Sequence, residues 1–326
     1  KLKQWEAVLN KYLNDTKMIC KIVGDATKSD SPTKIVESIL PTMNDGDRVV
    51  FDVTHGLRNQ PIITSFVIMY LRYLKNIKEV EFYYGAKDLD GKVVRLDFCN
   101  DLLRATEAVA IYEQTGNYEQ IGRNLGMSDS FDRKLEKLVF LDEVNKTDPQ
   151  IPKELAQELE NSTFEPLQKS LVERFKQPIY WAKNQSLSKQ LQHKALFAFD
   201  RKQYYKAVLI LTEAIVVAYG ENCGDAEIAE NLATFSARNR AEDELIGKWN
   251  DSSKVYVVGV LDEAQKQTYL NLKKLRNAMA HGTDVNGKEE EAKATRKAVD
   301  DEEKLRTIFN EGAKLFAAVS NQMVGR

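Results

Sequence analysis

The feature that most constrains the fold of this chain is a change of hydrophobic pattern near residue 100. Before that point, short apolar runs rich in β-branched residues alternate with segments of helical pattern. The runs cover residues 17–26, 47–53 and 80–86. Their order predicts an α/β domain with a mostly parallel sheet, in which ligands bind beyond the carboxyl ends of the strands.

Several details of this first part predict how the sheet is covered. The stretch "SPTKIVESIL" has a Ser cap and a Pro at the first helical position. Residues 62–76 are apolar almost all round, as expected of a crossover helix packed tightly against a sheet, and residues 47–53 are expected to form a buried strand. A turn at "DLDGK" predicts that residues 93–98 pair back as a hairpin.

Beyond Cys99 the apolar residues recur with the helical period, and the remaining strand-like run is residues 255–260. Two segments show a continuous apolar stripe, made of Tyr204, Val208, Leu211, Ile215 and Ala218 in the first and of Leu305, Ile308, Phe309, Phe316 and Val319 in the second. Gly220 is expected to cap the first of these helices. The fold class predicted is therefore an N-terminal α/β domain followed by an all-α domain.

Length and composition exclude several function classes. At 326 residues the chain is long enough for two domains, and 43% hydrophobic and 29% charged residues are typical of a water-soluble protein. No apolar run reaches the length of a membrane span, and three cysteines without C-x-x-C spacing indicate a reducing compartment, so we expect a cytoplasmic protein without membrane partners. A net charge of −2 argues against binding long duplex DNA and leaves room for a short RNA site. The chain lacks an initiator Met, so we expect native sequence upstream of residue 1.

The first candidate site is the stretch "VVFDVTHGLRNQP", residues 49–61, where a strand passes into a helix. A glycine there lets the backbone approach a ligand, and the helix N-terminus offers free N–H groups to an anion. An arginine suits a phosphate, and neighbouring amides can bind base edges. The candidate ligand-binding residues are Asp52, Thr54, His55, Gly56, Arg58 and Asn59. The alternative is that these residues only cap the following helix.

The second candidate site is "LRNAMAHGTD", residues 275–284. Leu272, Leu275 and Met279 are expected to form the buried stripe of a helix, whereas Lys273, Asn277 and His281 lie on a separate polar stripe. Arg276 lies about 140° round the helix from His281 at 100° per residue. One helix cannot easily aim both side chains at a single atom, but two copies facing each other can.

This arrangement meets the needs of RNA cleavage by its own 2′-OH. The reaction requires a base, an acid, and positive charge near the phosphorane, which histidine and arginine supply. A homodimer with the two helices across a twofold axis brings two histidines and two arginines into one cleft without a metal. The alternative is that His281 serves only as a cation at the helix C-terminus, where Gly282 ends the turn.

A resemblance to a known family supports the first site. The stretch "DVTHGLRNQP" is similar to the D-x-T-H-G signature of CRISPR-associated proteins whose N-terminal CARF domain, a Rossmann-like sheet, senses cyclic oligoadenylate. The resemblance implies that Asp52, Thr54, His55 and Gly56 help to form the ligand pocket, with Arg58 and Asn59 adjacent. It implies cyclic tetra- or hexa-adenylate as the activator. The family's first strand and its Gly-containing loop are not visible in this sequence.

The second site also resembles a family motif. The stretch "LRNAMAH" looks like the R-N-x-x-A-H form of the HEPN ribonuclease motif, so Arg276, Asn277 and His281 are the implied catalytic residues. Together the two motifs resemble the CARF-HEPN ribonucleases of type III CRISPR systems. The resemblance implies a homodimeric endoribonuclease of antiviral defence, activated by cyclic oligoadenylate. It would cleave single-stranded RNA to leave a 2′,3′-cyclic phosphate, with no metal or other cofactor and no DNA partner.

The domains implied are a cyclic-oligoadenylate sensor at 1–125, a helical connection at 126–165 and a HEPN ribonuclease domain at 166–326. Two alternatives stay open. The sensor domain could itself cleave the cyclic ligand as a ring nuclease, or the helical domain could be a non-catalytic scaffold that responds to the ligand. The motifs of zinc hydrolases, P-loop NTPases and dinucleotide oxidoreductases are missing from the sequence.

Overall fold

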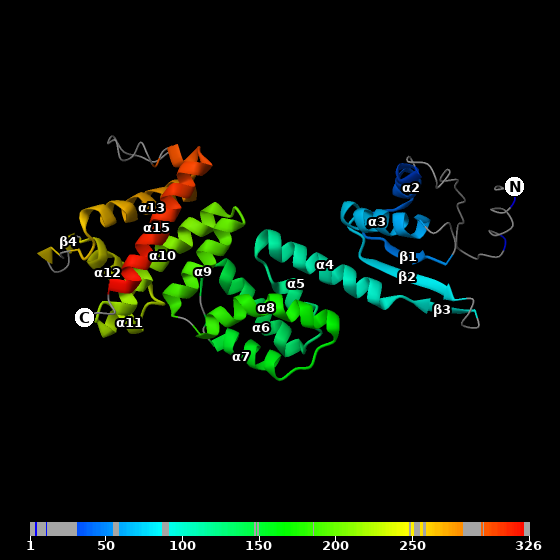
Figure 1. The fold of residues 1–326 in the computed structure, drawn as a ribbon, viewed down its shortest axis with the longest axis horizontal. Coiled ribbons are helices and arrows are strands. Elements are labelled where there is room, and N and C mark those ends of the chain that lie inside the picture. The colour runs from blue at the N-terminus through cyan, green and yellow to red at the C-terminus, as the bar shows by residue number, and fades with distance from the viewer. Residues whose placement is uncertain are drawn as a thin grey trace. The chain divides into compact units, whose positions relative to one another are not determined.

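A computed structural model of the chain describes, apart from residues 4 and 11, residues 31–54, 59–86, 91–146, 148, 150–184, 186–247, 249–250, 255–256, 259–282, 295 and 297–322. The chain divides into two compact units, Lys1–Arg104 and Ala105–Arg326 (Figure 1). The division falls within a helix, α4 (Asp97–Thr115). The predicted domain bounds at residues 125 and 165 stay predictions.

The N-terminal unit alternates helix and strand, as the pattern predicts. Its elements are α2 (Ser31–Ile39), the 3₁₀ turn η1 (Leu40–Thr42), β1 (Arg48–Asp52), α3 (Asn59–Leu74), β2 (Glu79–Ala86) and β3 (Lys92–Arg95). β1 lies parallel to β2, and β3 returns antiparallel to β2, which confirms the predicted crossover and hairpin. The returning strand is shorter than predicted, because it ends at Arg95 and α4 begins at Asp97. The predicted strand at 17–26 lies outside the described residues.

The prediction that residues 47–53 form a buried strand was wrong. Val49 and Phe51 pack against the small core around Ile68 of α3, but Val50, between them, is 59% exposed. Successive side chains of a strand point to opposite faces of the sheet, and α3 packs on the face that carries Val49 and Phe51.

The prediction that α3 packs tightly against the sheet is confirmed, although its apolar surface is not buried all round. One side of α3 contacts the sheet through Ile68, and a second side meets α2 through Val67 and Leu71. These two contacts leave part of the helix surface open, because a helix buries only the side chains that face a neighbour. The exposed residues on this surface recur along the helix and are Ile62, Phe66, Tyr70 and Tyr73.

The C-terminal unit is helical over most of its described length. After α4 come α5 (Glu119–Arg123), α6 (Asp129–Glu143), α7 (Gln150–Glu160), α8 (Pro166–Asn184), α9 (Leu187–Asp200), α10 (Tyr204–Asn222), α11 (Ala226–Glu230), α12 (Phe235–Ile246), α13 (Glu263–His281) and α15 (Glu302–Gln322). Of the strand-like run at 255–260, the structure describes the two-residue strand β5 (Val255–Tyr256), paired antiparallel with β4 (Trp249–Asn250), whereas residues 257 and 258 lie outside the described residues. Within the described ranges, no helix combines the length and the apolar character needed to cross a bilayer.

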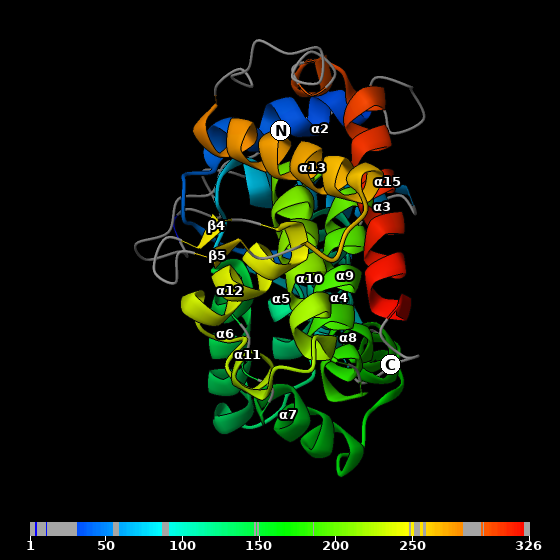
Figure 2. The same cartoon turned by 90° about the vertical axis from the view of Figure 1, so that its left-hand side faces the viewer.

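Two hydrophobic cores hold this unit together. One lies among α4 to α8 and contains the buried rings of Tyr112, Phe131 and Phe175. The other surrounds α10, which packs against α9, α12, α13 and α15 and buries twelve of its nineteen residues (Figure 2). Both predicted apolar stripes, on α10 and on α15, face this second core. The nearly all-apolar sequence of α10 therefore has its explanation in a central position.

Gly220 does not end α10, contrary to the prediction. The helix continues to Asn222, and Gly220 is buried where α11 and α12 approach. A Cβ at this position would lie 2.5 Å from Leu232 Cδ2 and 3.2 Å from Ile228 Cγ2. Close packing between helices, and not the backbone conformation of a cap, therefore favours glycine at this position.

Candidate functional site

The polar residues at the end of β1 stabilise the turn that follows the strand. Asp52 Oδ1 accepts hydrogen bonds from the backbone N–H of Thr54, at 2.8 Å, and from the Thr54 hydroxyl. Thr54 Oγ1 in turn accepts the N–H of Gly85 in β2, at 2.5 Å. These contacts place Asp52 and Thr54 together at the carboxyl edge of the two parallel strands, where the sequence predicts a ligand.

The other predicted ligand-binding residues are not tested by this geometry. His55, Gly56 and Arg58 lie outside the described residues. Asn59 is the first residue of α3. The free N–H groups of the first turn of α3 therefore follow closely after the turn made by Asp52 and Thr54.

An ion-pair cluster on the same sheet was not predicted. Glu81 of β2 is only 3% exposed, and its carboxylate accepts Nη2 of Arg48 at 2.9 Å and lies 3.4 Å from Nη1 of Arg95. The hydrogen bond from Arg48 is the largest cause that lowers the pKa of Glu81, and Tyr83 also donates to it at 3.2 Å. The cluster joins all three strands and stabilises the sheet.

The helix that carries the second motif is well defined at both ends. Asp262 and Gln265 form a capping box at the start of α13, with Asp262 Oδ1 accepting the N–H of Gln265 at 2.8 Å and Gln265 Oε1 accepting the N–H of Asp262 at 3.2 Å. Gly282 ends the helix in the left-handed conformation, with φ of 59°. Leu272 and Leu275 are fully buried, as predicted, so the helix is held in one rotation about its axis.

Two of the three predicted catalytic residues lie in direct contact. Asn277 Oδ1 accepts Nε of Arg276 at 3.1 Å and Nη2 at 3.0 Å. The third residue, His281, lies one turn further on, and both Asn277 and His281 are exposed. Within one chain the structure therefore joins Arg276 to Asn277 and leaves the imidazole of His281 accessible at the helix end.

Glu213 is a partner of Arg276 that the sequence reasoning missed. It lies on α10, and its carboxylate is 3.5 Å from Nη1 of Arg276 and 3.1 Å from Nη1 of Arg238 of α12. Its side chain is 23% exposed, so the two guanidinium groups share one half-buried carboxylate. The available signal was a single acidic residue within the apolar run "VLILTEAIVVA".

A second carboxylate orders the next turn of α13. Glu242 of α12 forms an ion pair with Lys273 and accepts the hydroxyl of Tyr269 at 2.8 Å. Burial, and then the charge of Glu242, hold the pKa of Tyr269 well above its ordinary value. The polar stripe predicted on α13 is confirmed for Asn277 and His281, which face solvent. It is confirmed only in part for Lys273, which turns toward α12.

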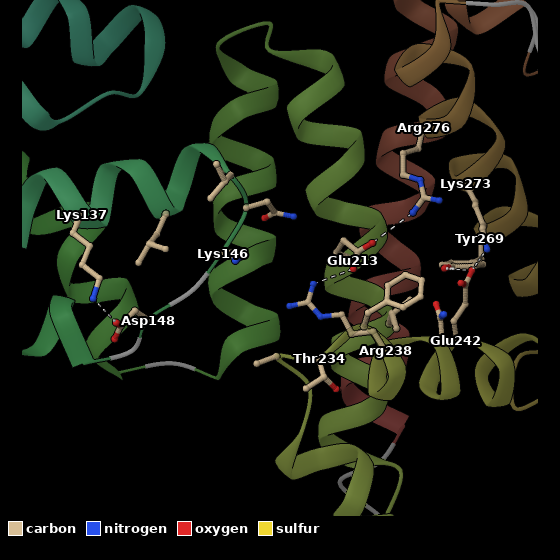
Figure 3. A pocket seen from close by; sticks show the side chains of 17 residues that line it. Lys137, Lys146, Asp148, Glu213, Thr234, Arg238, Glu242, Tyr269, Lys273 and Arg276 are labelled. Carbon is tan, nitrogen blue, oxygen red and sulfur yellow. Dashed lines mark hydrogen bonds and ion pairs between the residues drawn. The ribbon is translucent and has the colours of Figure 1, made fainter.

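A cavity of about 900 Å³ opens beside these charged pairs (Figure 3). One wall comes from the end of α6 and the α6–α7 connection, and the other comes from α10, α12 and α13. Its charged lining residues are the cations Lys137, Lys146, Arg238, Lys273 and Arg276 and the carboxylates Asp148, Glu213 and Glu242. Arg276 faces this cavity, whereas Asn277 and His281 are not among the residues that line it. The excess of cations suits an anionic ligand.

The geometry defines a protein with an N-terminal α/β unit and a helical unit that carries an Arg-Asn-His helix beside a cationic cavity. Over 97 residues the chain is 31% identical to the CRISPR-associated protein MJ1674 of Methanocaldococcus jannaschii. The similarity covers 27% of this chain and 15% of that longer protein. No family model matches the chain.

Proposed function

We propose that this chain is a CRISPR-associated endoribonuclease that cyclic oligoadenylate activates. The similarity to a CRISPR-associated protein supports the association with CRISPR defence. The order of the two units, α/β then helical, is that of a sensor followed by an effector, and each unit carries its motif. Type III systems are the proposed context, because they are the context of the CARF-HEPN ribonucleases that both motifs resemble.

The observation that carries the proposal is the arrangement at the end of α13. Asn277 and Glu213 hold the guanidinium of Arg276, and His281 is exposed one turn away. In the proposed homodimer, Arg276 and His281 from both copies meet at one phosphate. One histidine accepts the proton of the 2′-OH, the other protonates the 5′-oxygen, and the arginines stabilise the phosphorane, so a 2′,3′-cyclic phosphate forms without a metal.

The proposed activator site is the carboxyl edge of β1 and β2. Asp52 and Thr54 shape the turn there, and His55, Gly56, Arg58 and Asn59 are the proposed neighbours of the phosphates and bases. Cyclic tetra- or hexa-adenylate is the proposed ligand. Activation is then a shift between two states, which requires the ligand to prefer the active state by a few kcal/mol.

A fluorogenic single-stranded RNA assay tests the proposal. The protein is incubated with metal chelator and with cyclic tri-, tetra- or hexa-adenylate in parallel. We expect one ring size to start cleavage, and we expect His281→Ala to lower the rate by about 100-fold or more, the usual worth of a proton-transfer residue. His193→Ala, a histidine of α9 outside the motif, is the matched control.

Three outcomes would count against the proposal. Unchanged cleavage by His281→Ala would remove the catalytic assignment. Ligand binding without any RNA cleavage would favour the non-catalytic scaffold, and linear products from the cyclic ligand in the His281→Ala protein would favour the ring nuclease.

A further inference from the structure

The cavity beside Arg276 has a held shape and an uneven charge distribution. Lys206 Nζ forms an ion pair with Glu143 at 3.1 Å, and Lys194 pairs with Asp142, so the end of α6 is fixed to α9 and α10. The carboxylates on the opposite wall are occupied by Arg276, Arg238 and Lys273. A volume of about 900 Å³ is within the size range of ligand pockets, roughly 300–1,000 Å³.

Two lysines on the α6 side of the cavity are available to an anion. Lys137 Nζ is 3.7 Å from Asp148, and because its side chain is 63% exposed, this pair is weak. Lys146 is exposed, and no carboxylate of the described ranges forms an ion pair with its ammonium group. Phosphates can therefore bind these lysines without breaking a strong contact.

One aromatic ring lies in the same cavity. Phe235 is the first residue of α12 and is 80% exposed, more than any other large hydrophobic side chain among the residues described. The preceding Thr234 caps the helix by accepting the N–H of Ala237 at 3.3 Å. Because Thr234 also lines the cavity, the N-terminus of α12, which is its positive end, faces this region. An exposed ring among cations is the pattern of sites for single-stranded nucleic acid, in which bases stack on aromatic side chains.

We propose that this cavity is the groove that holds single-stranded RNA on its way to Arg276. Phe235 stacks with a base, and Lys137 and Lys146 bind phosphates on the opposite wall. Arg276, which lines the same cavity, receives the phosphate nearest the cleavage site. The inference rests on the proposed function and adds to it the path of the substrate, which Phe235, Lys137 and Lys146 define outside the Arg-Asn-His motif.

Equilibrium binding of a labelled ten-nucleotide 2′-O-methyl RNA tests the groove separately from cleavage, because methylation removes the attacking 2′-OH. We expect Phe235→Ala to weaken binding roughly 5- to 100-fold, the effect of removing one base-stacking ring. The double variant Lys137→Gln/Lys146→Gln should lower the slope of log affinity against log salt by about 0.7 for each lost phosphate contact.

Exposed residues outside the cavity provide matched controls. Phe140→Ala, on α6, and Lys169→Gln, on α8, should bind RNA as wild type does. If both cavity variants bind RNA with the affinity and salt dependence of the wild type, the proposed groove is wrong, even if His281→Ala loses cleavage. The proposed groove would also be wrong if an acidic peptide bound the protein as tightly as RNA does, competed with RNA for it, and kept its affinity in the Phe235→Ala variant. Continued cleavage by His281→Ala would instead contradict the proposed function and leave the binding result to stand.

Discussion

Glu213 forms ion pairs with arginines of two neighbouring helices. Its carboxylate lies between the guanidinium groups of Arg276 and Arg238, which approach from two different helices. The three side chains are all less than a quarter exposed, so the contacts are shielded more than a surface ion pair is. A neutral residue in place of Glu213 would leave two cations facing each other near α10.

We therefore expect Glu213→Gln to lower the free energy of unfolding of the helical unit by about 1–3 kcal/mol, the cost of leaving charged partners without their acceptor. Urea denaturation followed by circular dichroism measures this change. Glu230→Gln, at an exposed position on α11, is the control and should have no measurable effect. An equal stability of both variants would show that the two arginines do not need the carboxylate.

At the scale of elements, α10 organises the helical unit and α13 carries the motif. α10 is apolar on almost every side because five helices, α9, α11, α12, α13 and α15, pack around it. α13 has one buried face, a capping box at Asp262 and a left-handed glycine at Gly282, and these local features place His281 in its last turn. At Gly220, α10 approaches the α11–α12 segment closely, because a Cβ there would lie 2.5 Å from Leu232 Cδ2.

Gly220→Ala should destabilise the protein by about 1–3 kcal/mol, because the added methyl group overpacks against Leu232. In a helix without close neighbours the same change stabilises the helix by about 1 kcal/mol. A loss of stability would therefore show that overpacking at position 220 outweighs the higher helix propensity of alanine. A double-mutant cycle with Leu232→Ala, measured by urea denaturation, provides the control. Gly220→Ala should lower the free energy of unfolding by less when it is combined with Leu232→Ala. Purely additive effects of the two substitutions would show that residues 220 and 232 are not in tight contact.

At the scale of the whole molecule, three buried tyrosines of the helical unit each donate a hydrogen bond to a carboxylate. Tyr118 donates to Asp142 at 2.5 Å, Tyr219 to Glu244 at 3.1 Å, and Tyr269 to Glu242 at 2.8 Å. Burial is the largest cause that raises the pKa of each tyrosine, and the neighbouring carboxylate raises it further. These pairs lie in different parts of the unit, so the whole unit responds to alkaline pH.

A raised pKa in the folded state means that stability is complete below the ordinary tyrosine pKa of about 10 and is lost as the pH rises above it. Unfolded tyrosines then release protons that the folded ones keep. We expect the free energy of unfolding to fall by up to about 1.4 kcal/mol per pH unit for each such tyrosine. Tyr269→Phe should make this fall shallower. A stability independent of pH above 10, measured by urea denaturation, would contradict the raised pKa values.

Much of the fold could be predicted, because element type depends on local patterns. Residues 31–39, 48–52, 79–86 and 92–95 form the expected elements, and the stripes on α10 and α15 face the core. The exposed faces of β1 and α3 could not be predicted, since apolar content alone does not tell how many neighbours an element has.

The candidate site was predicted in part. The position of Arg276, Asn277 and His281 at the end of one helix follows from a capping box, a buried stripe and a terminal glycine, all readable in the sequence. Glu213, Glu242 and the cavity with Phe235 were not predicted, because they bring together helices that are separated along the chain.

The sequence by itself determined the order of the elements, the two-part organisation and the residues that end α13, because hydrophobic period and helix capping act between near neighbours. The tertiary structure alone decided which carboxylate Arg276 meets, which lysines share its cavity and why a small residue at position 220 is favoured. Those features depend on how α6, α10, α12 and α13 pack, and packing between distant segments is set by the shapes of all the side chains at once.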